Sequence, residues 1–490
     1  MHRLLLCCLT LTLASAADLK SKIDDLVATW PALTNAYVGM QVVSLTDGHV
    51  LYERNQDRLL APASNMKLFT TALALTRLGP QYRLTTQICA ARPIDANGTL
   101  DTDLVLVGGG DPSMSGRTYP YQNHSTSSGD FSFRGVDELV SQLVSKGLKR
   151  VRGDIVGDDR RYLWAPYADG WTFGDSMWEY GAPVSALILD DNGFAVTIRP
   201  AARAGDPAQL QLIPPLEYFS VDNRVRTQEG GERRIDFDRK SSSRQVHIWG
   251  SIPIGDNGMT QLLAVDDPAL YAAEVLRDAL TRRGISVHGK AVARHRMSDD
   301  ASNPDPGRLR VVLAQRSSPP LAELLQVIDK VSQNLHAEVM LREVGAVARH
   351  FGSRDAGLAE MRDFLTEIGV SKDDFRLTDG SGLSRSTLVT PAAITKLLIY
   401  MYKSSNRDTF VDLLPIAGVD GTLRTRFADH PEARAIRAKT GTLGHVRANS
   451  GYIDSPEYGS LAFSFLVNNY GAPTSDISKF LDAVELALLH

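Results

Sequence analysis

Four residues near the N-terminus, Ser64-Asn65-Met66-Lys67, bring a hydroxyl and an amine close enough to act together. Residues three apart in a helix share one face, so the Lys67 side chain can lie beside the Ser64 hydroxyl. Pro62 precedes the pair, an apolar helical pattern follows it, and Gly79-Pro80 ends that pattern. Ser64 is therefore expected in the first turn of a helix, where unpaired N–H groups and the helix dipole favour negative charge.

Two further motifs follow this pair and complete a set of groups for acyl transfer. Ser332-Gln333-Asn334 lies where one helical pattern gives way to the next, and Lys439-Thr440-Gly441-Thr442 ends a strand-like run. A serine needs a base to become a nucleophile, and Lys67 can serve only as the neutral amine. Desolvation and the second ammonium group, on Lys439, would both lower the pKa of Lys67. The predicted catalytic residues are Ser64, Lys67 and Ser332, the last relaying a proton to the leaving group.

The remaining residues of these motifs suit a peptide substrate. The Asn334 amide can hold the peptide backbone, and the strand that ends in the third motif offers an edge to which a peptide can add. The backbone N–H groups of Thr442 and Ser64 would form an oxyanion hole, and Gly441 lets a substrate approach the strand closely. The residues that can bind a terminal carboxylate are Lys439, Thr440 and Thr442.

Other patterns in the chain carry less chemistry. Ser404-Ser405-Asn406 is a second S-x-N match, but its position after a predicted helix and before Arg407-Asp408 is typical of a solvated loop. Gly108-Gly109-Gly110 is no phosphate-binding loop, because no Gly-Lys-Ser/Thr follows it. His336 has no second ligand at metal-binding spacing, so it is expected to be an ordinary helix residue. The sequence predicts neither a metal site nor a cofactor.

Composition restricts the class of protein. The chain has 490 residues, of which 43% are hydrophobic and 22% charged, as expected of a soluble globular protein of roughly two to four domains. The net charge of −4 argues against a nucleic-acid-binding surface. No apolar run is long enough to span a bilayer.

The first 16 residues have the pattern of a signal peptide. His2 and Arg3 form a positive start, an apolar run follows, and Ala14-Ser15-Ala16 is a small-residue cleavage site. We therefore expect export, to the periplasm. Two of the three cysteines lie in this segment, so the mature chain would keep only Cys89 and form no internal disulfide.

The two ends of the chain have the patterns of helices and strands, whereas the middle has mainly the patterns of short strands and turns. Helices are predicted over residues 18–30, 268–283, 321–327, 335–349, 358–368, 391–402 and at the C-terminus, and strands over 37–45, 49–53, 435–441, 448–453 and 460–468. From about residue 82 to 296 short strands and turns dominate, with examples at 104–107, 152–156, 194–198 and 245–249, a polar loop at 117–132 and one lone helix. This pattern predicts an α+β domain whose antiparallel sheet is made from both chain ends, interrupted by a β-rich insertion. The predicted boundaries are 1–16 (signal peptide), 17–82 and 306–490 (catalytic domain) and 83–305 (insertion).

The three motifs, in this order, are the signature of the penicillin-interacting serine enzymes. With further stretches of the chain they resemble the class C low-molecular-mass penicillin-binding proteins, serine D-alanyl-D-alanine carboxypeptidases/endopeptidases of the bacterial cell wall. The additional stretches are 106–112, 153–155, 379–385 and 418–423. The resemblance implies a penicillin-binding transpeptidase-like domain with a five-stranded sheet and an insertion of two nested smaller domains. It also implies peptidoglycan peptides as substrates, β-lactams as covalent inhibitors, and relatives that form homodimers.

The resemblance further implies a pocket for the peptide side chain. In relatives that act on diaminopimelate-type peptidoglycan, an acidic residue of the insertion contacts the free amine end of that side chain, beside an aromatic residue. Asp175 and Tyr180 stand at the matching places, and the alternative is that Asp175 is a solvated loop carboxylate.

Two other functions stay open at this point. A β-lactamase would use the same three motifs, but over 200 residues separate the first two and no deacylating glutamate motif is evident. A non-catalytic peptidoglycan-binding protein could keep the fold, although the complete set of reactive residues argues against it. The sequence does not decide between carboxypeptidase and endopeptidase activity.

Overall fold

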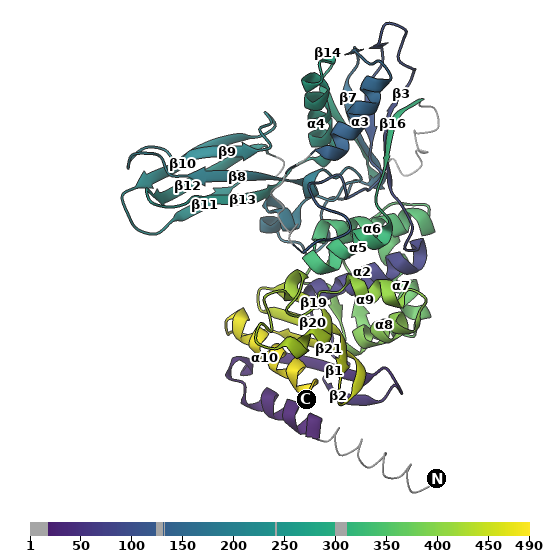
Figure 1. Ribbon diagram of the computed structural model, residues 1–490, viewed down its shortest axis with the longest axis vertical. Helices are drawn as coiled ribbons and strands as arrows, with labels where there is room; N and C mark the ends of the chain where they lie inside the picture. Colours follow the sequence, from purple (N-terminus) through teal and green to yellow (C-terminus); the bar gives the residue numbers. More distant parts are fainter. Residues whose placement is uncertain (1–17, 124–130, 132, 241–242, 299–310) are drawn as a thin grey trace.

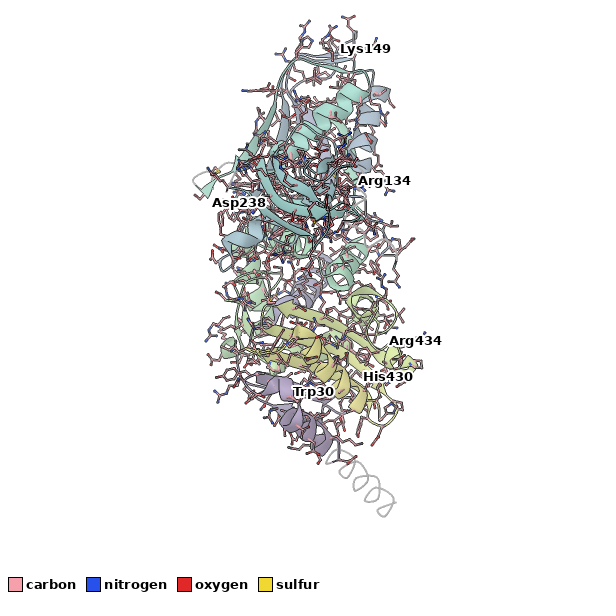
Figure 2. All side chains as sticks on the ribbon, turned by 90° about the vertical axis from the view of Figure 1, so that its left-hand side faces the viewer. Trp30, Arg134, Lys149, Asp238, His430 and Arg434 are labelled. Atoms are coloured by element: carbon pink, nitrogen blue, oxygen red, sulfur yellow. The ribbon has the colours of Figure 1, made fainter. Side chains whose placement is uncertain are left out.

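The computed structural model describes residues 18–123, 131, 133–240, 243–298 and 311–490 (Figure 1). The molecule is elongated. The two chain ends form one half and the insertion forms the other, with an arm of strands projecting sideways. In the view turned by 90°, Lys149 marks the far end of the insertion and Trp30 lies near the opposite end (Figure 2). The predicted signal peptide and its two cysteines lie outside the described residues.

A five-stranded antiparallel sheet joins the two ends of the chain, in the order β19-β20-β21-β1-β2. The N-terminal strand β1 pairs with the C-terminal strand β21 from Tyr37↔Asn468 to Ser44↔Leu461. This arrangement confirms the predicted sheet, and it leaves β19 at one edge. The strands are β1 (Tyr37–Ser44), β2 (Val50–Arg54), β19 (Ile436–Leu443), β20 (Val446–Ser455) and β21 (Gly459–Asn468).

Helices cover both faces of this sheet because each contributes an apolar stripe. On one face lies α10 (Thr474–Ala487), whose Ile477, Phe480, Leu481 and Val484 are buried, together with the helix at residues 18–29. On the other face α2 (Met66–Leu78) runs through the centre of a helical cluster. The other members are α5 (Leu321–Gln326), the π-helical turn η8 (Val327–Val331), α6 (Asn334–Ala348), α7 (Arg354–Glu367), α8 (Pro391–Lys403) and α9 (Arg407–Leu413). Short turns and a small hairpin complete this half: η1 (Pro31–Leu33), η2 (Ala63–Asn65), η9 (Lys372–Asp374), η10 (Gly421–Leu423), η11 (Pro431–Ala435), β17 (Phe375–Arg376) and β18 (Leu388–Val389).

The insertion contains two groups of sheets. Nearest the catalytic half, β15-β7-β5-β3-β16 form a mixed sheet covered by two helices. These elements are β3 (Thr85–Ala90), β5 (Leu104–Val107), β7 (Ile155–Leu163), β15 (Ala291–Arg296), β16 (Val311–Ser317), α3 (Arg134–Ser145) and α4 (Pro268–Arg282), with a small sheet of β4 (Thr99–Leu100), β6 (Arg150–Val151) and β14 (Ser286–Val287). The projecting arm is formed by β8 (Gly193–Arg199), β9 (Gln209–Ile213), β10 (Ser220–Gln228), β11 (Arg234–Asp238), β12 (Gln245–Pro253) and β13 (Met259–Ala264). Three short turns connect it: η3 (Phe173–Met177), η4 (Glu179–Gly181) and η5 (Asp190–Asn192).

Some local predictions were wrong. The insertion holds two helices rather than one, because α3 buries Val136, Leu139, Val140 and Leu143 at helical spacing directly after the polar loop. Helix α9 was also missed, since a seven-residue helix gives too short a pattern. The predicted boundary at residue 306 lies outside the described residues. Strand β16 still pairs with β3 of the insertion, so the chain re-enters the catalytic half after Ser317.

Candidate active site

The sequence at the start of α2 places Ser64 at the edge of the sheet. Ser64 occupies the 3-10 turn η2, directly ahead of α2, and is partly exposed. Its neighbour Asn65 is buried and ties this turn to the sheet. With its amide nitrogen toward β19, Asn65 donates to the Lys439 backbone oxygen at 2.8 Å and accepts from the Ser450 hydroxyl at 2.7 Å. The turn and the third motif are thus joined by a hydrogen bond that neither motif reveals by itself.

Lys67 is completely buried and lies beside the nucleophile. Its Nζ is 2.8 Å from Ser64 Oγ, 2.6 Å from Asn334 Oδ1 and 2.8 Å from the Ser381 backbone oxygen. Desolvation, followed by the nearby charge of Lys439, lowers the pKa of Lys67 well below its usual value. A neutral amine has two N–H donors and one lone pair. Since the two carbonyl oxygens can only accept, they take both N–H groups, and the lone pair remains for the Ser64 proton.

The Ser381 backbone oxygen is a site group that motif reasoning did not single out. Its loop is held by buried carboxylates: Glu338 accepts from the Gly380 and Ser381 N–H groups at 2.8 and 2.9 Å, and Asp379 accepts from the Ser381 hydroxyl at 3.1 Å. Arg342 in turn pairs with Glu338 at 3.0 Å. The family-like Asp379–Arg385 stretch was the sequence signal that could have pointed to this loop. The contact between the Ser381 carbonyl and Lys67, however, depends on the tertiary fold.

The second motif faces the third across the site. The π-helical turn η8 ends at Ser332, which adopts the left-handed conformation with φ of 69°. Lys439 donates to the Ser332 hydroxyl at 2.9 Å and to the Thr440 backbone oxygen at 2.8 Å. Burial lowers the pKa of Lys439 to about 8, while the buried carboxylate of Asp329 opposes this shift. Lys439 therefore keeps most of its charge at neutral pH, and the lowered pKa of Lys67 favours its neutral amine form.

Asp329 is a second group that the sequence interpretation missed. It lies in η8 three residues before Ser332, is fully buried, and interacts electrostatically with Lys439, Lys67 and Lys330. Desolvation raises the pKa of Asp329 to about 6, against the pull of the three lysines. Its negative charge favours the protonated form of both lysines of the site, so it helps to set where each of them titrates.

Strand β19 presses closely on the nucleophile turn. A Cβ atom on Gly441 would lie 2.6 Å from the Pro62 oxygen and 3.1 Å from the Ser64 nitrogen, so only glycine fits there. This proximity places the N–H groups of Ser64 and of the end of β19 at one spot, as an oxyanion hole requires. Thr440 donates to the Thr422 hydroxyl at 2.7 Å, and Thr442 is exposed at the end of the strand.

The predicted side-chain pocket is connected to this centre. The Asn334 amide donates to the Tyr180 backbone oxygen at 2.9 Å, and the Tyr180 hydroxyl donates to Asp175 Oδ1 at 3.2 Å. Asp175 is not a freely solvated carboxylate, because its Oδ2 accepts from the Thr172 N–H at 2.7 Å and caps η3. One carboxylate oxygen is used in the fold, and the other faces Tyr180.

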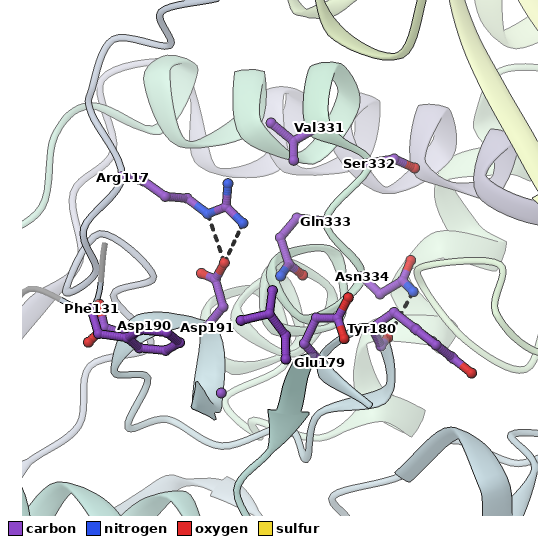
Figure 3. Close-up of a pocket in the computed structure, with 12 residues that line it drawn as sticks. Arg117, Phe131, Glu179, Tyr180, Asp190, Asp191, Val331, Ser332, Gln333 and Asn334 are labelled. Carbon is purple, nitrogen blue, oxygen red and sulfur yellow. Dashed lines mark hydrogen bonds and ion pairs between the residues drawn. The ribbon is translucent and has the colours of Figure 1, made fainter. Parts of the chain in front are cut away.

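A cavity of about 170 Å³ lies beside Ser332 and Asn334 (Figure 3). Its wall includes a buried ion pair between Arg117 and Asp191. His336, which is fully buried, lies 2.8 Å from Asp191, so it is a partner of this pair. Within the described part of the chain, no group of His, Cys, Asp and Glu side chains could hold a metal ion.

The rival S-x-N match lies elsewhere. Ser404 ends α8, with its hydroxyl on the Met401 oxygen at 2.8 Å, and Asn406 precedes α9. The Ser404 hydroxyl serves the turn between these two helices, and the Asn406 amide donates to the Leu75 backbone oxygen of α2 at 3.4 Å. Among the residues described, none of the helices combines the length and apolar character that crossing a bilayer requires.

Comparisons with known proteins agree with this geometry. The profile of the D-Ala-D-Ala carboxypeptidase 3 (S13) family matches residues 19–487. A D-alanyl-D-alanine carboxypeptidase of an Actinomadura species is 33% identical over 486 residues, covering 97% of this chain and 85% of that protein. The D-alanyl-D-alanine carboxypeptidase DacB of Haemophilus influenzae is 26% identical over 466 residues, covering 93% and 90%.

Solved structures give the same fold. The crystal structure of penicillin-binding protein 4 from Haemophilus influenzae superimposes with a TM-score of 0.81 at 24% identity, covering 95% of this chain and 99% of that one. The same protein in complex with a β-lactam superimposes with a TM-score of 0.76 at 23% identity, with the same coverage.

Proposed function

We infer that this chain, which belongs to the D-Ala-D-Ala carboxypeptidase 3 (S13) family, is a serine D-Ala-D-Ala carboxypeptidase/endopeptidase that uses Ser64 as its nucleophile. The observation that carries the assignment of Ser64 is the 2.8 Å contact with the buried Lys67, whose pKa is lowered by desolvation and whose other two polar contacts are carbonyl oxygens. The proposed substrates are the stem peptides or cross-links of peptidoglycan.

The acylation step follows from these contacts. Ser64 Oγ attacks the carbonyl carbon of the scissile D-Ala bond while its proton passes to the Lys67 amine. The oxyanion is stabilised by the N–H groups of Ser64 and Thr442. As the C–N bond breaks, Ser332 gives its hydroxyl proton to the leaving nitrogen. Ser332 is free to donate because it accepts its own hydrogen bond from Lys439. The proton that Lys67 took from Ser64 then passes to Ser332 and restores its hydroxyl group.

Deacylation and substrate placement complete the cycle. Water attacks the Ser64 ester and releases the shortened peptide, with Lys67 again able to take the proton. The edge position of β19 supports binding of the peptide as an added strand, with the Asn334 amide on its other side. The charge of Lys439, with the hydroxyls of Thr440 and Thr442, supports binding of the terminal carboxylate. β-Lactams carry a matching carbonyl and carboxylate and are proposed as covalent inhibitors.

The first test is covalent labelling. Intact-protein mass spectrometry with benzylpenicillin should show one adduct on the wild type and none on Ser64→Ala. Ser404→Ala, in the rival motif, is the matched control and should label like the wild type. An unlabelled wild type, or an adduct that survives Ser64→Ala, would overturn the assignment.

The second test concerns substrate choice. Incubation with purified peptidoglycan should release free D-Ala if the carboxypeptidase activity dominates, and uncross-linked muropeptides if the endopeptidase activity does.

The N-terminal pattern of a signal peptide supports export to the periplasm, where such substrates occur. The resemblance to relatives that form dimers supports a homodimer.

The third test addresses the side-chain pocket. Since Asp175 reaches Tyr180, and Tyr180 reaches Asn334, Asp175→Ala is expected to reduce hydrolysis of diaminopimelate-containing peptides roughly tenfold, the worth of one charge-assisted hydrogen bond. Penicillin lacks that side chain, so the rate at which it acylates Ser64 should change little. Asp373→Ala, an exposed aspartate of another loop, is the control. Equal losses on peptide and penicillin would reject the role of Asp175 in side-chain recognition.

A further inference from the structure

A partly buried cation lies next to the end of the third motif, in a place that no motif marks. Arg447 is on β20 and is the direct cross-strand partner of Thr442. Side chains of directly paired residues emerge on the same face of a sheet. Accordingly, the Arg447 Nη1 donates to the Thr442 hydroxyl oxygen.

The guanidinium group of Arg447 has little else to bind. Its Nε is buried without a hydrogen-bond partner, and no carboxylate among the described residues lies within ion-pairing distance of it. The nearest acids are engaged: Asp482 pairs with Arg426, and Glu485 accepts from the Asn449 amide at 2.5 Å. A partly buried arginine whose Nε is unpaired and which has no counter-ion is stabilised when a ligand supplies one.

The charges around this arginine leave an excess of positive charge. Burial and the neighbouring Arg426 lower the pKa of Arg447 to about 10, so it remains protonated at neutral pH. Burial raises the pKa of Glu485 to about 7, so this acid is only partly ionised there. Tyr470 also lies near Arg447. The guanidinium groups of Arg447 and Arg426 therefore lie close to each other, and Asp482 is already paired with Arg426.

We propose that Arg447 is a positioning residue that makes Thr442 a donor to the terminal carboxylate of the substrate. A hydroxyl has one proton and two lone pairs. Because Thr442 Oγ1 accepts from Arg447, its single proton is left to point outward, and the adjacent positive charge strengthens that donation. The specificity for a free carboxylate then comes from Arg447 acting through Thr442, in addition to Lys439. This inference rests on the proposed function.

The test compares two probes that differ only in this carboxylate. One is an acylaminoacyl thiolester whose leaving group carries a free carboxylate, and the other is the same thiolester as its methyl ester. For Arg447→Gln we expect kcat/KM on the carboxylate probe to fall about tenfold or more, as for loss of a hydrogen bond to a charged group. The methyl ester should lose less than about threefold by the same reasoning.

Two further variants separate this role from a structural one. Arg447→Lys keeps the charge and should recover part of the preference for the carboxylate probe. In a Thr442→Val background, Arg447→Gln should cost much less on that probe, since the residue through which it acts is gone. A structural defect would lower both probes equally, with no recovery by lysine, and would overturn the inference while leaving the proposed function intact. A wild type that cleaves neither probe and takes no penicillin adduct would overturn both.

Discussion

At the scale of single residues, the site places two buried lysines in different electrostatic environments. Lys67 and Lys439 are both fully buried. After desolvation, the largest influence on Lys67 is the charge of Lys439, which lowers its pKa, whereas for Lys439 it is the carboxylate of Asp329, which raises its pKa. The base and the charged anchor are thus the same residue type in two electrostatic environments. The distinction depends on burial and neighbours, which act on the free energy of the protonated form.

A bell-shaped dependence of kcat/KM on pH is expected from these pKa values. The rising acid limb reports loss of the proton from Lys67, and activity should fall as pH rises through about 8, where Lys439 loses its charge. The measurement is kcat/KM for the carboxylate thiolester across the pH range in which the fold persists. In Lys439→Arg, which stays charged, the alkaline limb should move upward. A wild-type plateau extending through pH 10 would contradict this assignment.

The same reasoning predicts the direction in which the pH profile moves when the charge of Asp329 is removed. Removing its negative charge in Asp329→Asn disfavours the protonated form of both lysines, so both limbs should move to lower pH by about one unit. Asp373→Asn, an exposed control, should leave the profile in place. Unchanged limbs in Asp329→Asn would show that its charge is not felt at the site.

At the scale of elements, the nucleophile turn is held between two backbone segments at glycine contacts. Gly441 of β19 packs on one side, and on the other a Cβ at Gly382 would lie 1.8 Å from the Ala63 oxygen. Gly382 also has φ of +77°, which L-residues rarely adopt. The turn itself is strained, since Ala63 has φ of 46°. The reactive serine is therefore positioned by backbone packing rather than by its own helix alone.

Gly382→Ala should accordingly slow penicillin acylation by about a hundredfold, because misplacing a reacting group by about 1 Å has an effect of that size. The measurement is the rate of adduct formation. Gly369→Ala is the matched control: its φ is +82° but nothing lies within 4 Å of the added atom. Gly369→Ala should lose only the roughly 1 kcal/mol of folding stability that an alanine at positive φ costs, and its acylation rate should be near that of the wild type. Equal rates in the two variants would show that the contact with Ala63 does not position Ser64.

At the scale of the whole molecule, a buried carboxylate joins the insertion to the catalytic half. Glu343 of α6 is fully buried and accepts from Arg161 at 2.8 Å and from the hydroxyls of Tyr162 and Tyr82 at 2.8 and 2.5 Å. Arg161 and Tyr162 belong to β7 of the insertion. The helix that begins at Asn334 is thus anchored in the neighbouring domain, which also supplies Tyr180 to the site.

Glu343→Gln should destabilise the protein by about 3 kcal/mol, since it leaves the Arg161 guanidinium without its buried partner. For a chain of this size that corresponds to a fall in Tm of roughly 3 °C, measurable by calorimetry. Asp101→Asn, which removes the exposed pair with Arg152, is the control and should change Tm by less than about 1 °C. A variant as stable as the wild type would show that the two halves do not depend on this contact.

The sequence by itself determined the chemistry and the architecture at low resolution. Ser64, Lys67, Ser332, Asn334 and Lys439 were found from residue type and spacing, and the sheet made from both chain ends followed from the change of texture along the chain. These features are local, because the spacing of residues in a helix and their alternation in a strand can be recognised within short stretches of sequence. The resemblance to relatives added Asp175 and Tyr180.

Only the tertiary structure decided which groups tune and hold those residues. The Ser381 carbonyl, Asp329 and Arg447 lie far along the chain from Ser64, and residue type and spacing did not single them out as site groups. Their importance comes from burial and from contacts between distant segments, and neither can be read from spacing. Charges have large effects only where the fold has removed water around them. For this reason the reactive residues and the lowered pKa of Lys67 could be predicted from the sequence, and the opposing effect of Asp329 on both lysines could not.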